Sequence, residues 1–416
     1  MKKLLLIIGT FYILFYPPLF GFHSLRIMAA ISLIYLFIRM PGWNVIFNTN
    51  RIKVVYITWI FVLIWISMII LLNGTSLGSV NSYVYWLLSV IPCSLMIGNE
   101  VRRNGGDVKE LIDIALYAGL LQGICSVLAF FVPAVKNFFL TQMASAEILD
   151  LSHYGYYVNM RLYGFSNGLT YAMPVLQAFL AMLAIYMTIN RNIKYLLFVP
   201  FTLFSAIVNA RTSLVIIAIC GIVLLLQKSN HSSQKTGRVM MLIAIGLITL
   251  YGGVRILQIY APNTFLWIAD GAGQIELFFR GQFDRGYFSY LLDADRWKFP
   301  SGIAFFFGEG LRILGENSTG NYTDVGYVND VWLGGLSYTI FIYAIVISYL
   351  RKLAKSGKEN EKEASLVKYI AVSLLLSGIL LNLKGYVVNL NCIANFFIFI
   401  ACFQSLTLPR QINNNA

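Results

Sequence analysis

The chain has little of what a soluble enzyme is made from. Only 12% of its 416 residues are charged, and 58% are hydrophobic. Five cysteines without CxxC spacing and three scattered histidines provide the pattern of neither a disulfide framework nor a metal cluster. This composition excludes an ordinary soluble protein and indicates a polytopic membrane protein.

Long apolar runs determine the expected fold class. They are continuous rather than alternating, which favours helices over a membrane β-barrel. We predict an all-α integral membrane protein with about twelve transmembrane helices, each near the ~20 residues that a bilayer requires. The predicted spans lie near residues 4–21, 25–39, 53–72, 83–98, 111–132, 171–189, 194–210, 213–227, 238–256, 328–350, 364–383 and 389–405.

Basic residues orient these spans. With the N-terminus inside, every inner connection is basic, as in Arg102–Arg103 and Arg351–Lys352, which agrees with the positive-inside rule. Both termini are therefore predicted to be cytoplasmic, and the first apolar run is expected to be an uncleaved helix. The net charge of +13 then reflects membrane topology, and we expect no nucleic-acid partner.

Two outer segments are long, at residues 133–170 and 257–327, within a single transmembrane domain covering residues 1–416. By this topology the outer side carries eight arginines and three lysines, against eight arginines and twelve lysines on the inner side. Topology selection needs only positive charge, so the outer arginine excess indicates a second role. Arginine suits bidentate binding of phosphate or diphosphate, although pairing with outer carboxylates is the alternative.

Arg211 and Arg161 are the sharpest candidates. Arg211 lies between two apolar runs with almost no loop, where an arginine costs on the order of 2.5–3.5 kcal/mol unless it is paired or reaches the interface. Arg161 lies in a segment rich in glycine and aromatic residues, near His153, Tyr157 and Tyr163. These rings suit stacking on sugars, or they form an ordinary interfacial aromatic belt.

The segment 257–327 carries further candidates. An apolar stripe with i+4 spacing from residue 275 to 291 predicts an amphipathic interfacial helix, from which Arg280 or Arg285 would reach a ligand unless the helix only packs. Arg296 is a third donor for an anion. Asp293-Ala294-Asp295 has the DxD form of some metal sites, but so short a match is common by chance, and we predict no metal and no cofactor.

Asp324 and Tyr327 stand at the start of an apolar run. A carboxylate there can accept a proton as a general base, or it can cap the helix. Asp330, one turn further in, is either a functional acid or part of an internal salt bridge.

The layout and three short motifs resemble the Wzy-type O-antigen polymerases, within the superfamily that includes the O-antigen ligases. The motifs are Arg161-Leu162-Tyr163-Gly164-Phe165, Asn209-Ala210-Arg211-Thr212-Ser213, and Asp324-Val325-Gly326-Tyr327 leading into Gly334-Gly335-Leu336. In the ligase pattern a histidine stands where this chain has Asp324, which favours a polymerase over a ligase.

The resemblance implies a metal-independent, inverting glycosyltransferase in the bacterial inner membrane. Its donor and acceptor would be undecaprenyl-diphosphate-linked oligosaccharide repeats, polymerised on the periplasmic face, with outer-face arginines holding the diphosphate. Our candidate catalytic residues are Arg211 and Arg161 as these arginines, and Asp324, with Tyr327, as the base. A chain-length regulator and a flippase of the same pathway would be partners. The rival functions are a ligase that transfers glycan to lipid A–core, and a transporter such as that flippase.

Overall fold

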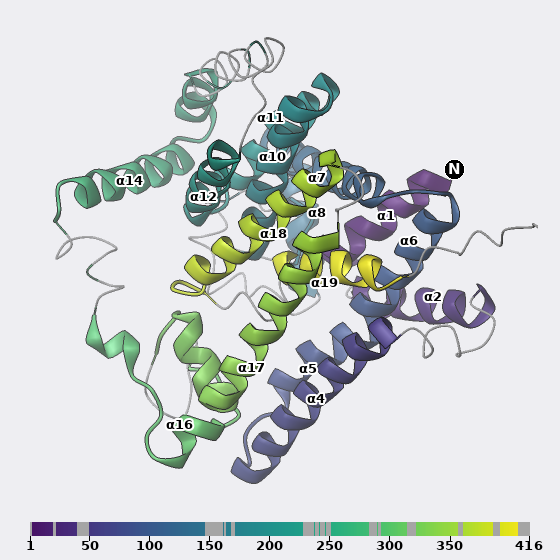
Figure 1. The fold of residues 1–416 in the computed structure, drawn as a ribbon. Coiled ribbons are helices and arrows are strands. Elements are labelled where there is room, and N and C mark those ends of the chain that lie inside the picture. The colour runs from purple at the N-terminus through teal and green to yellow at the C-terminus, as the bar shows by residue number, and fades with distance from the viewer. Residues whose placement is uncertain are drawn as a thin grey trace, which may run out of the picture.

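The computed structural model is a bundle of helices (Figure 1). It describes residues 2–19, 22–39, 50–145, 161, 164–167, 171–227, 237, 241, 246, 251–282, 289, 293–313, 322–356, 361–385 and 392–406. The elements of the first half are α1 (Lys2–Phe15), β1 (Pro18–Leu19), β2 (Phe22–His23), α2 (Ser24–Arg39), α4 (Asn50–Asn73), α5 (Gly78–Tyr85), η1 (Trp86–Val90), α6 (Ile91–Arg103), α7 (Val108–Phe131), α8 (Pro133–Ser145) and α10 (Ala172–Asn190). Those of the second half are η2 (Ile193–Leu197), α11 (Phe198–Ile207), α12 (Thr212–Leu226), α14 (Pro262–Phe279), η3 (Ala294–Trp297), α16 (Ile303–Phe307), α17 (Gly326–Ser356), α18 (Glu361–Leu381) and α19 (Cys392–Ser405).

The helices support a membrane protein, but not the full count of predicted spans. In the described part of the chain, six helices are long and apolar enough to cross a membrane. They match the predicted spans near residues 53–72, 83–98, 111–132, 171–189, 328–350 and 364–383. Four further predicted spans form shorter apolar helices, at 24–38, 193–207, 212–226 and 392–405. The predicted span 4–21 is shorter in the structure, where α1 ends at Phe15, and the predicted span 238–256 falls largely outside the described residues.

Helix α10 is the centre of the bundle. It is apolar on all sides, 89% of its span is buried, and it packs against α7, α11, α12 and α19. Small residues allow this close approach, because a Cβ on Gly119 of α7 would lie 2.7 Å from Leu180 of α10. By contrast, only 33% of the α4 span is buried, and side chains such as Ile64 and Leu72 face outward. Such a continuous apolar surface indicates contact with lipid.

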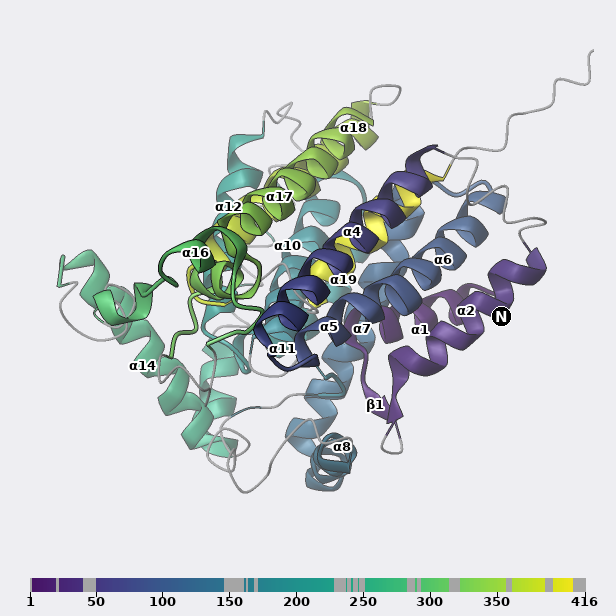
Figure 2. The same ribbon diagram turned by 90° about the horizontal axis from the view of Figure 1, so that it is seen from below.

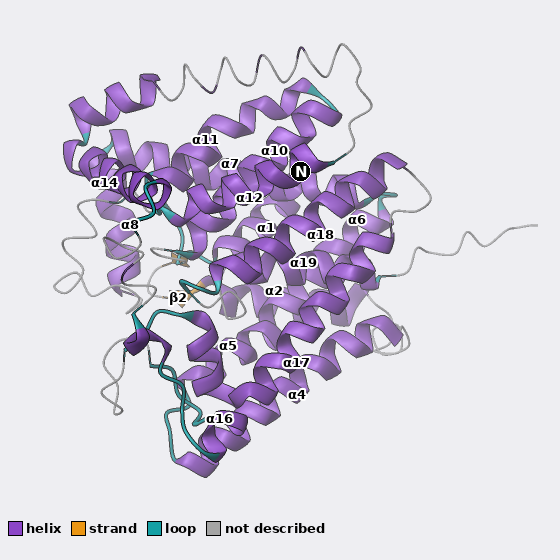
Figure 3. Cartoon of the chain, turned by 60° about the vertical axis from the view of Figure 1, so that its left-hand side comes forward, coloured by secondary structure: helices purple, strands orange, loops and turns teal. Residues whose placement is uncertain are grey.

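Figure 2 shows α17 and α18 running side by side, with α4 along the same flank. Figure 3 shows that helices make up nearly all of the described chain, and that much of the loop structure lies around α16. Helix α14 lies at the edge of the molecule in the views of Figures 1 and 2.

Helix α17 is interrupted at Gly335, where φ is 81°. A Cβ at this position would lie 2.2 Å from the carbonyl oxygen of Phe306, so only glycine fits. The amides of Glu309 and Gly310 and the indole of Trp65 donate to the three carbonyls before the break, at 2.7 to 3.1 Å. The segment containing α16 is therefore fixed to the broken helix.

The amphipathic helix predicted over residues 275–291 is not continuous. Its first turn belongs to α14, which begins earlier, at Pro262, and ends at Phe279. Gly281 has a φ of 69°, the left-handed conformation that ends many helices. The repeating apolar pattern extended past this glycine, which is why the sequence predicted a longer helix.

Candidate functional site

Several helix ends meet at one end of the bundle. The hydroxyl of Ser213, in the first turn of α12, donates to the carbonyl of Pro174 in the first turn of α10 at 3.3 Å. The hydroxyl of Tyr171, just before α10, donates to the carbonyl of Leu381 at the end of α18 at 2.9 Å. All these ends are predicted on the outer membrane face, and Arg211, Asp324 and Tyr327 lie at or beside them.

Arg161 and Arg211 meet on one indole. The guanidinium carbon of Arg161 lies 5.2 Å from the ring centroid of Trp267, and that of Arg211 lies 5.0 Å from it. The two carbons are therefore separated by at most the sum of these distances, about 10 Å. Cation–π attraction of this kind stabilises a cation by about 0.5–2 kcal/mol. The structure thus joins two arginines that are fifty residues apart in the chain.

A sharp turn between α11 and α12 places Arg211. Asn209 is buried, and its side-chain amide donates to the carbonyl of Ser205 at 2.8 Å. The hydroxyl of Ser213 donates back to the carbonyl of Ala206 at 2.8 Å. These two bonds satisfy carbonyls at the end of α11, so the chain reverses without a loop and Arg211 directly precedes α12.

Gly164 fixes the segment that carries Arg161. Its φ is 60°, and a Cβ there would lie 2.7 Å from both the side-chain amide of Gln122 and the hydroxyl of Ser126 on α7. A glycine is therefore required for this close approach of the backbone to α7. The sequence motif around Arg161 is a packing feature at this position as well as a candidate ligand segment.

Helix α14 supplies the partners of Arg211. The Nη2 atom of Arg211 donates to the carbonyl oxygen of Trp267 at 2.6 Å and lies 2.7 Å from Oδ2 of Asp270. Sequence reasoning identified neither Trp267 nor Asp270. Their spacing with the buried Gly271 marks the inward face of α14, but nothing local indicates that this face meets Arg211.

Arg211 is only partly neutralised. Its side chain is 33% exposed and that of Asp270 is 62% exposed, so the ion pair is screened by solvent and stabilises the fold by only about 0–1 kcal/mol. The Nε atom of Arg211 is buried and has no hydrogen-bond partner among the described residues. Arg211 therefore does pair with a carboxylate, the simpler alternative from the sequence, but this pair leaves the Nε–H donor of the guanidinium group without an acceptor among the described residues.

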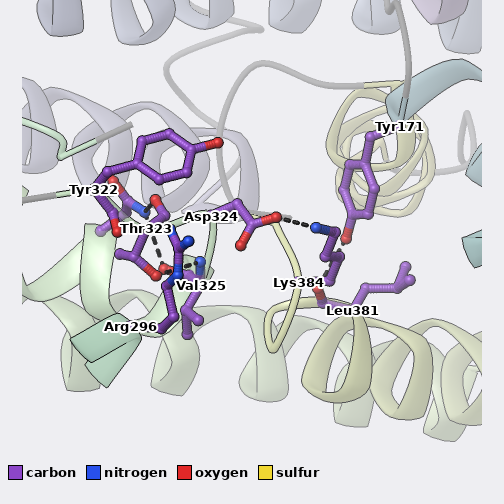
Figure 4. Close-up of polar contacts among 9 residues, drawn as sticks. Tyr171, Arg296, Tyr322, Thr323, Asp324, Val325, Leu381 and Lys384 are labelled. Carbon is purple, nitrogen blue, oxygen red and sulfur yellow. Dashed lines mark hydrogen bonds and ion pairs between the residues drawn. The ribbon is translucent and has the colours of Figure 1, made fainter. Parts of the chain in front are cut away.

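Asp324 does not cap α17. The first amides of that helix, on Gly326 and Tyr327, donate instead to the backbone carbonyl of Asn382, at 2.8 and 3.3 Å. The Oδ2 atom of Asp324 pairs with the ammonium of Lys384, as Figure 4 shows. The Oδ1 atom is buried and has no hydrogen-bond partner among the described residues. From the sequence, Lys384 is one of the three lysines expected on the outer side.

Tyr327 is held against α18. Its hydroxyl donates to the carbonyl of Ile379 at 2.8 Å, and its ring stacks on Tyr343 with centroids 5.6 Å apart. In this structure the hydroxyl therefore supports packing between α17 and α18.

The loop arginines differ from one another. Arg296 donates to the carbonyl of Tyr322 at 3.1 Å and lies over the ring of this tyrosine (Figure 4). Tyr322 precedes Asp324 by two residues. Arg280 pairs with Glu276 on the exposed side of α14, where both side chains are more than 60% exposed. Of the loop arginines predicted to bind substrate, Arg296 is thus placed near Asp324, whereas Arg280 has the simpler role of an exposed helix pair.

The carboxylates of the DxD motif have local partners. The side chain of Asp293 accepts the amide of Asp295 at 3.0 Å, and Asp295 pairs with Lys298 at 2.8 Å. This ammonium lowers the pKa of Asp295 below its usual value. Both contacts belong to the short helix η3.

Asp330 lies in a buried polar cluster. The side-chain amide of Asn382 donates to its Oδ2 at 3.2 Å, and Arg312 is a charged neighbour. The hydroxyls of Tyr83 and Tyr338 are hydrogen-bonded to each other beside it. Asn382 thus links Asp330 to the start of α17, an amide contact that the sequence did not predict.

Four predicted site residues lie outside the described residues: His153, Tyr157, Tyr163 and Arg285.

No model of a known protein family matches the chain, and no curated protein sequence matches it either. Function must therefore be inferred from the geometry of the site.

Proposed function

We propose that this protein polymerises undecaprenyl-diphosphate-linked oligosaccharide repeats, as a metal-independent inverting glycosyltransferase of a bacterial inner membrane. One lipid-linked glycan is the donor and another is the acceptor, and the reaction takes place on the periplasmic face. Undecaprenyl diphosphate is the leaving group.

The meeting of Arg161 and Arg211 on Trp267 carries this proposal. Two guanidinium groups within about 10 Å of each other place two positive charges at one ring, and Nε of Arg211 has no hydrogen-bond partner among the described residues. A diphosphate offers several acceptor oxygens and at least two negative charges, so it suits such a pair of arginines. The apolar helices around the site suit a donor with a long lipid tail.

The chemistry follows from charge. As the bond between the anomeric carbon and the diphosphate breaks, negative charge grows on the bridging oxygen. Arginines fixed beside that oxygen stabilise the transition state more than the ground state. A hydroxyl of the acceptor sugar attacks from the opposite face, which inverts the anomeric configuration.

Asp324 is the proposed base. Its carboxylate lies at the same end of the bundle, because Lys384 follows Leu381, which accepts the hydroxyl of Tyr171 at the start of α10. Transfer of the hydroxyl proton to Asp324 neutralises this carboxylate while negative charge appears on the leaving group. The positive charges of the site are thus balanced before and after the transfer.

The interrupted helix α17 favours a second candidate, a transporter. Broken helices and buried acids such as Asp330 are features of transporter binding sites. In a transporter the broken backbone lines a cavity, however, and here the carbonyls before Gly335 accept bonds from the segment around α16. This difference favours the polymerase.

Purified protein supplied only with lipid-linked repeats tests the proposal. A polymerase produces a ladder of lengthened glycans and releases undecaprenyl diphosphate. Lengthening that requires a lipid A acceptor would favour the ligase. Movement of labelled substrate across vesicles without any new glycosidic bond would favour the transporter.

A further inference from the structure

One face of helix α14 packs on the bundle. Among the side chains of α14 that the structure describes, Thr264 and Gly271 are buried, and Phe265 and Ile268 pack with Val208 in a small apolar cluster. A Cβ on Gly271 would lie 2.8 Å from Cδ of Arg211, so the helix lies directly on the arginine side chain. The position of α14 therefore depends on Arg211.

Both α14 acceptors share one nitrogen of Arg211. The carbonyl of Trp267 and the carboxylate of Asp270 lie 2.6 and 2.7 Å from Nη2. A carboxylate oxygen at this distance has the geometry of a phosphate oxygen bound to arginine. Asp270 thus occupies a place that an anionic ligand of Arg211 would need.

The balance favours replacement by a diphosphate. The side chain of Asp270 is 62% exposed, and among the described residues it forms an ion pair with Arg211. A diphosphate carries more negative charge than the carboxylate of Asp270. It can contact the guanidinium groups of Arg161 and Arg211 together, because both lie against the ring of Trp267. Two charge-assisted contacts are stronger than one screened surface pair.

We propose that Asp270 competes with the diphosphate for Arg211. Without ligand, the pair of Asp270 and Arg211 is a latch that holds α14 on the bundle, and the diphosphate displaces the carboxylate. The inference rests on the diphosphate site of the proposed function. When the carboxylate leaves Arg211, α14 loses one of its two polar contacts with this side chain, the other being the carbonyl of Trp267, and shifts at its start, where Pro262 follows a preceding helical segment (251–260). Donor binding and movement of α14 are then coupled.

Pyrophosphate binding to the full-length protein in nanodiscs tests the competition. Asp270→Asn removes the competing charge, and we expect pyrophosphate to bind about two- to fivefold tighter, the effect of a screened ion pair. Glu276→Gln is the matched control, because Glu276 lies on the same helix with the same 62% exposure but pairs with Arg280. Equal affinities of wild type and Asp270→Asn, or equal gains in both variants, would overturn the proposal.

The movement of α14 is measured by distances between two spin labels. Gly273→Cys places one label on the open side of α14, and Phe131→Cys places the other at the exposed end of α7. The half-buried Cys125 is replaced by serine in this background. Pyrophosphate should broaden or shift the distance distribution, and Asp270→Asn should produce the same change without ligand. A distribution that responds to neither would contradict the latch.

These results separate the latch from the polymerase. Tighter pyrophosphate binding by Asp270→Asn without any glycan ladder would keep the latch and reject the polymerase. A normal ladder together with unchanged pyrophosphate affinity and unmoved α14 would keep the polymerase and reject the latch.

Discussion

Two cation–carboxylate pairs lie at the same end of the molecule, and they differ in burial. In the pair of Arg211 and Asp270 the carboxylate is 62% exposed, whereas in the pair of Lys384 and Asp324 it is 14% exposed. A buried carboxylate depends strongly on its partner, but an exposed one does not. The first pair can therefore open for a ligand, whereas the second fixes a charge at the site.

Asp324→Asn should produce the largest effect. The variant keeps the size of the side chain but cannot accept the proton, so we expect kcat to fall by about 10²–10⁴. Binding of the lipid-linked donor should remain within about twofold of wild type. Rates of chain lengthening and donor binding are measured on the same preparation, with Asp293→Asn as the control. A wild-type rate would remove Asp324 from catalysis.

Arg211→Ala should reduce the rate by about 10²–10³, equivalent to about 2.7–4 kcal/mol, because a donor to the leaving group is lost. Arg161→Ala should have a comparable effect. Arg255→Ala is the control, since this exposed arginine lies over the ring of Tyr251. Normal glycan ladders from both Arg161→Ala and Arg211→Ala would contradict a diphosphate site on Trp267.

Lys384→Met tests the buried pair directly. It leaves the carboxylate of Asp324 without its ammonium partner. Because this ion pair is only partly buried, we expect the free energy of unfolding to fall by about 2 kcal/mol. Asp270→Asn should change that free energy by less than about 1 kcal/mol. Thermal unfolding in detergent compares them, and Lys384→Arg should restore most of the loss. Equal losses for Lys384→Met and Asp270→Asn would remove the distinction between the two pairs.

Gly271→Ala should lower the rate about tenfold, because the added methyl group displaces the side chain of Arg211 from its position. Gly273→Ala is a matched control on the same helix, where a Cβ has nothing within 4 Å. Chain-lengthening rates of the two variants are compared at equal protein level. If Gly273→Ala were as slow as Gly271→Ala, the effect would come from the helix and not from Arg211.

Arg280→Ala should have the smallest effect, less than about twofold on rate, since Arg280 forms an exposed pair with Glu276 away from Trp267. The same assay measures it. A loss as large as that of Arg211→Ala would place α14 differently during the reaction.

The sequence predicted the apolar helices best where the runs are long. The run of Val108–Phe131 forms a helix close to its predicted bounds, because apolar length alone decides it. The runs on either side of Arg211 form helices too short to count among the long spans, since the turn at Asn209 is made by side-chain bonds to buried carbonyls. Hydropathy does not contain that information.

For each contact in the site, the sequence indicated one of the two partners and not the other. Arg211 was singled out because a charge between two apolar runs is unusual, and Arg161 because its segment is rich in glycine and aromatic residues. Trp267, Asp270 and Lys384 were not, because each is ordinary in its own segment and gains its role from a helix far away in the chain. Such tertiary partners follow from packing and not from local pattern.

The most direct test of the convergent anion site is a double-mutant cycle with Arg161→Ala and Arg211→Ala, read out as pyrophosphate affinity of the full-length protein in nanodiscs. If both guanidinium groups bind one diphosphate, each single variant should lose most of the affinity and the double variant little more. Losses that simply add, or an affinity that neither variant changes, would contradict a shared site on Trp267.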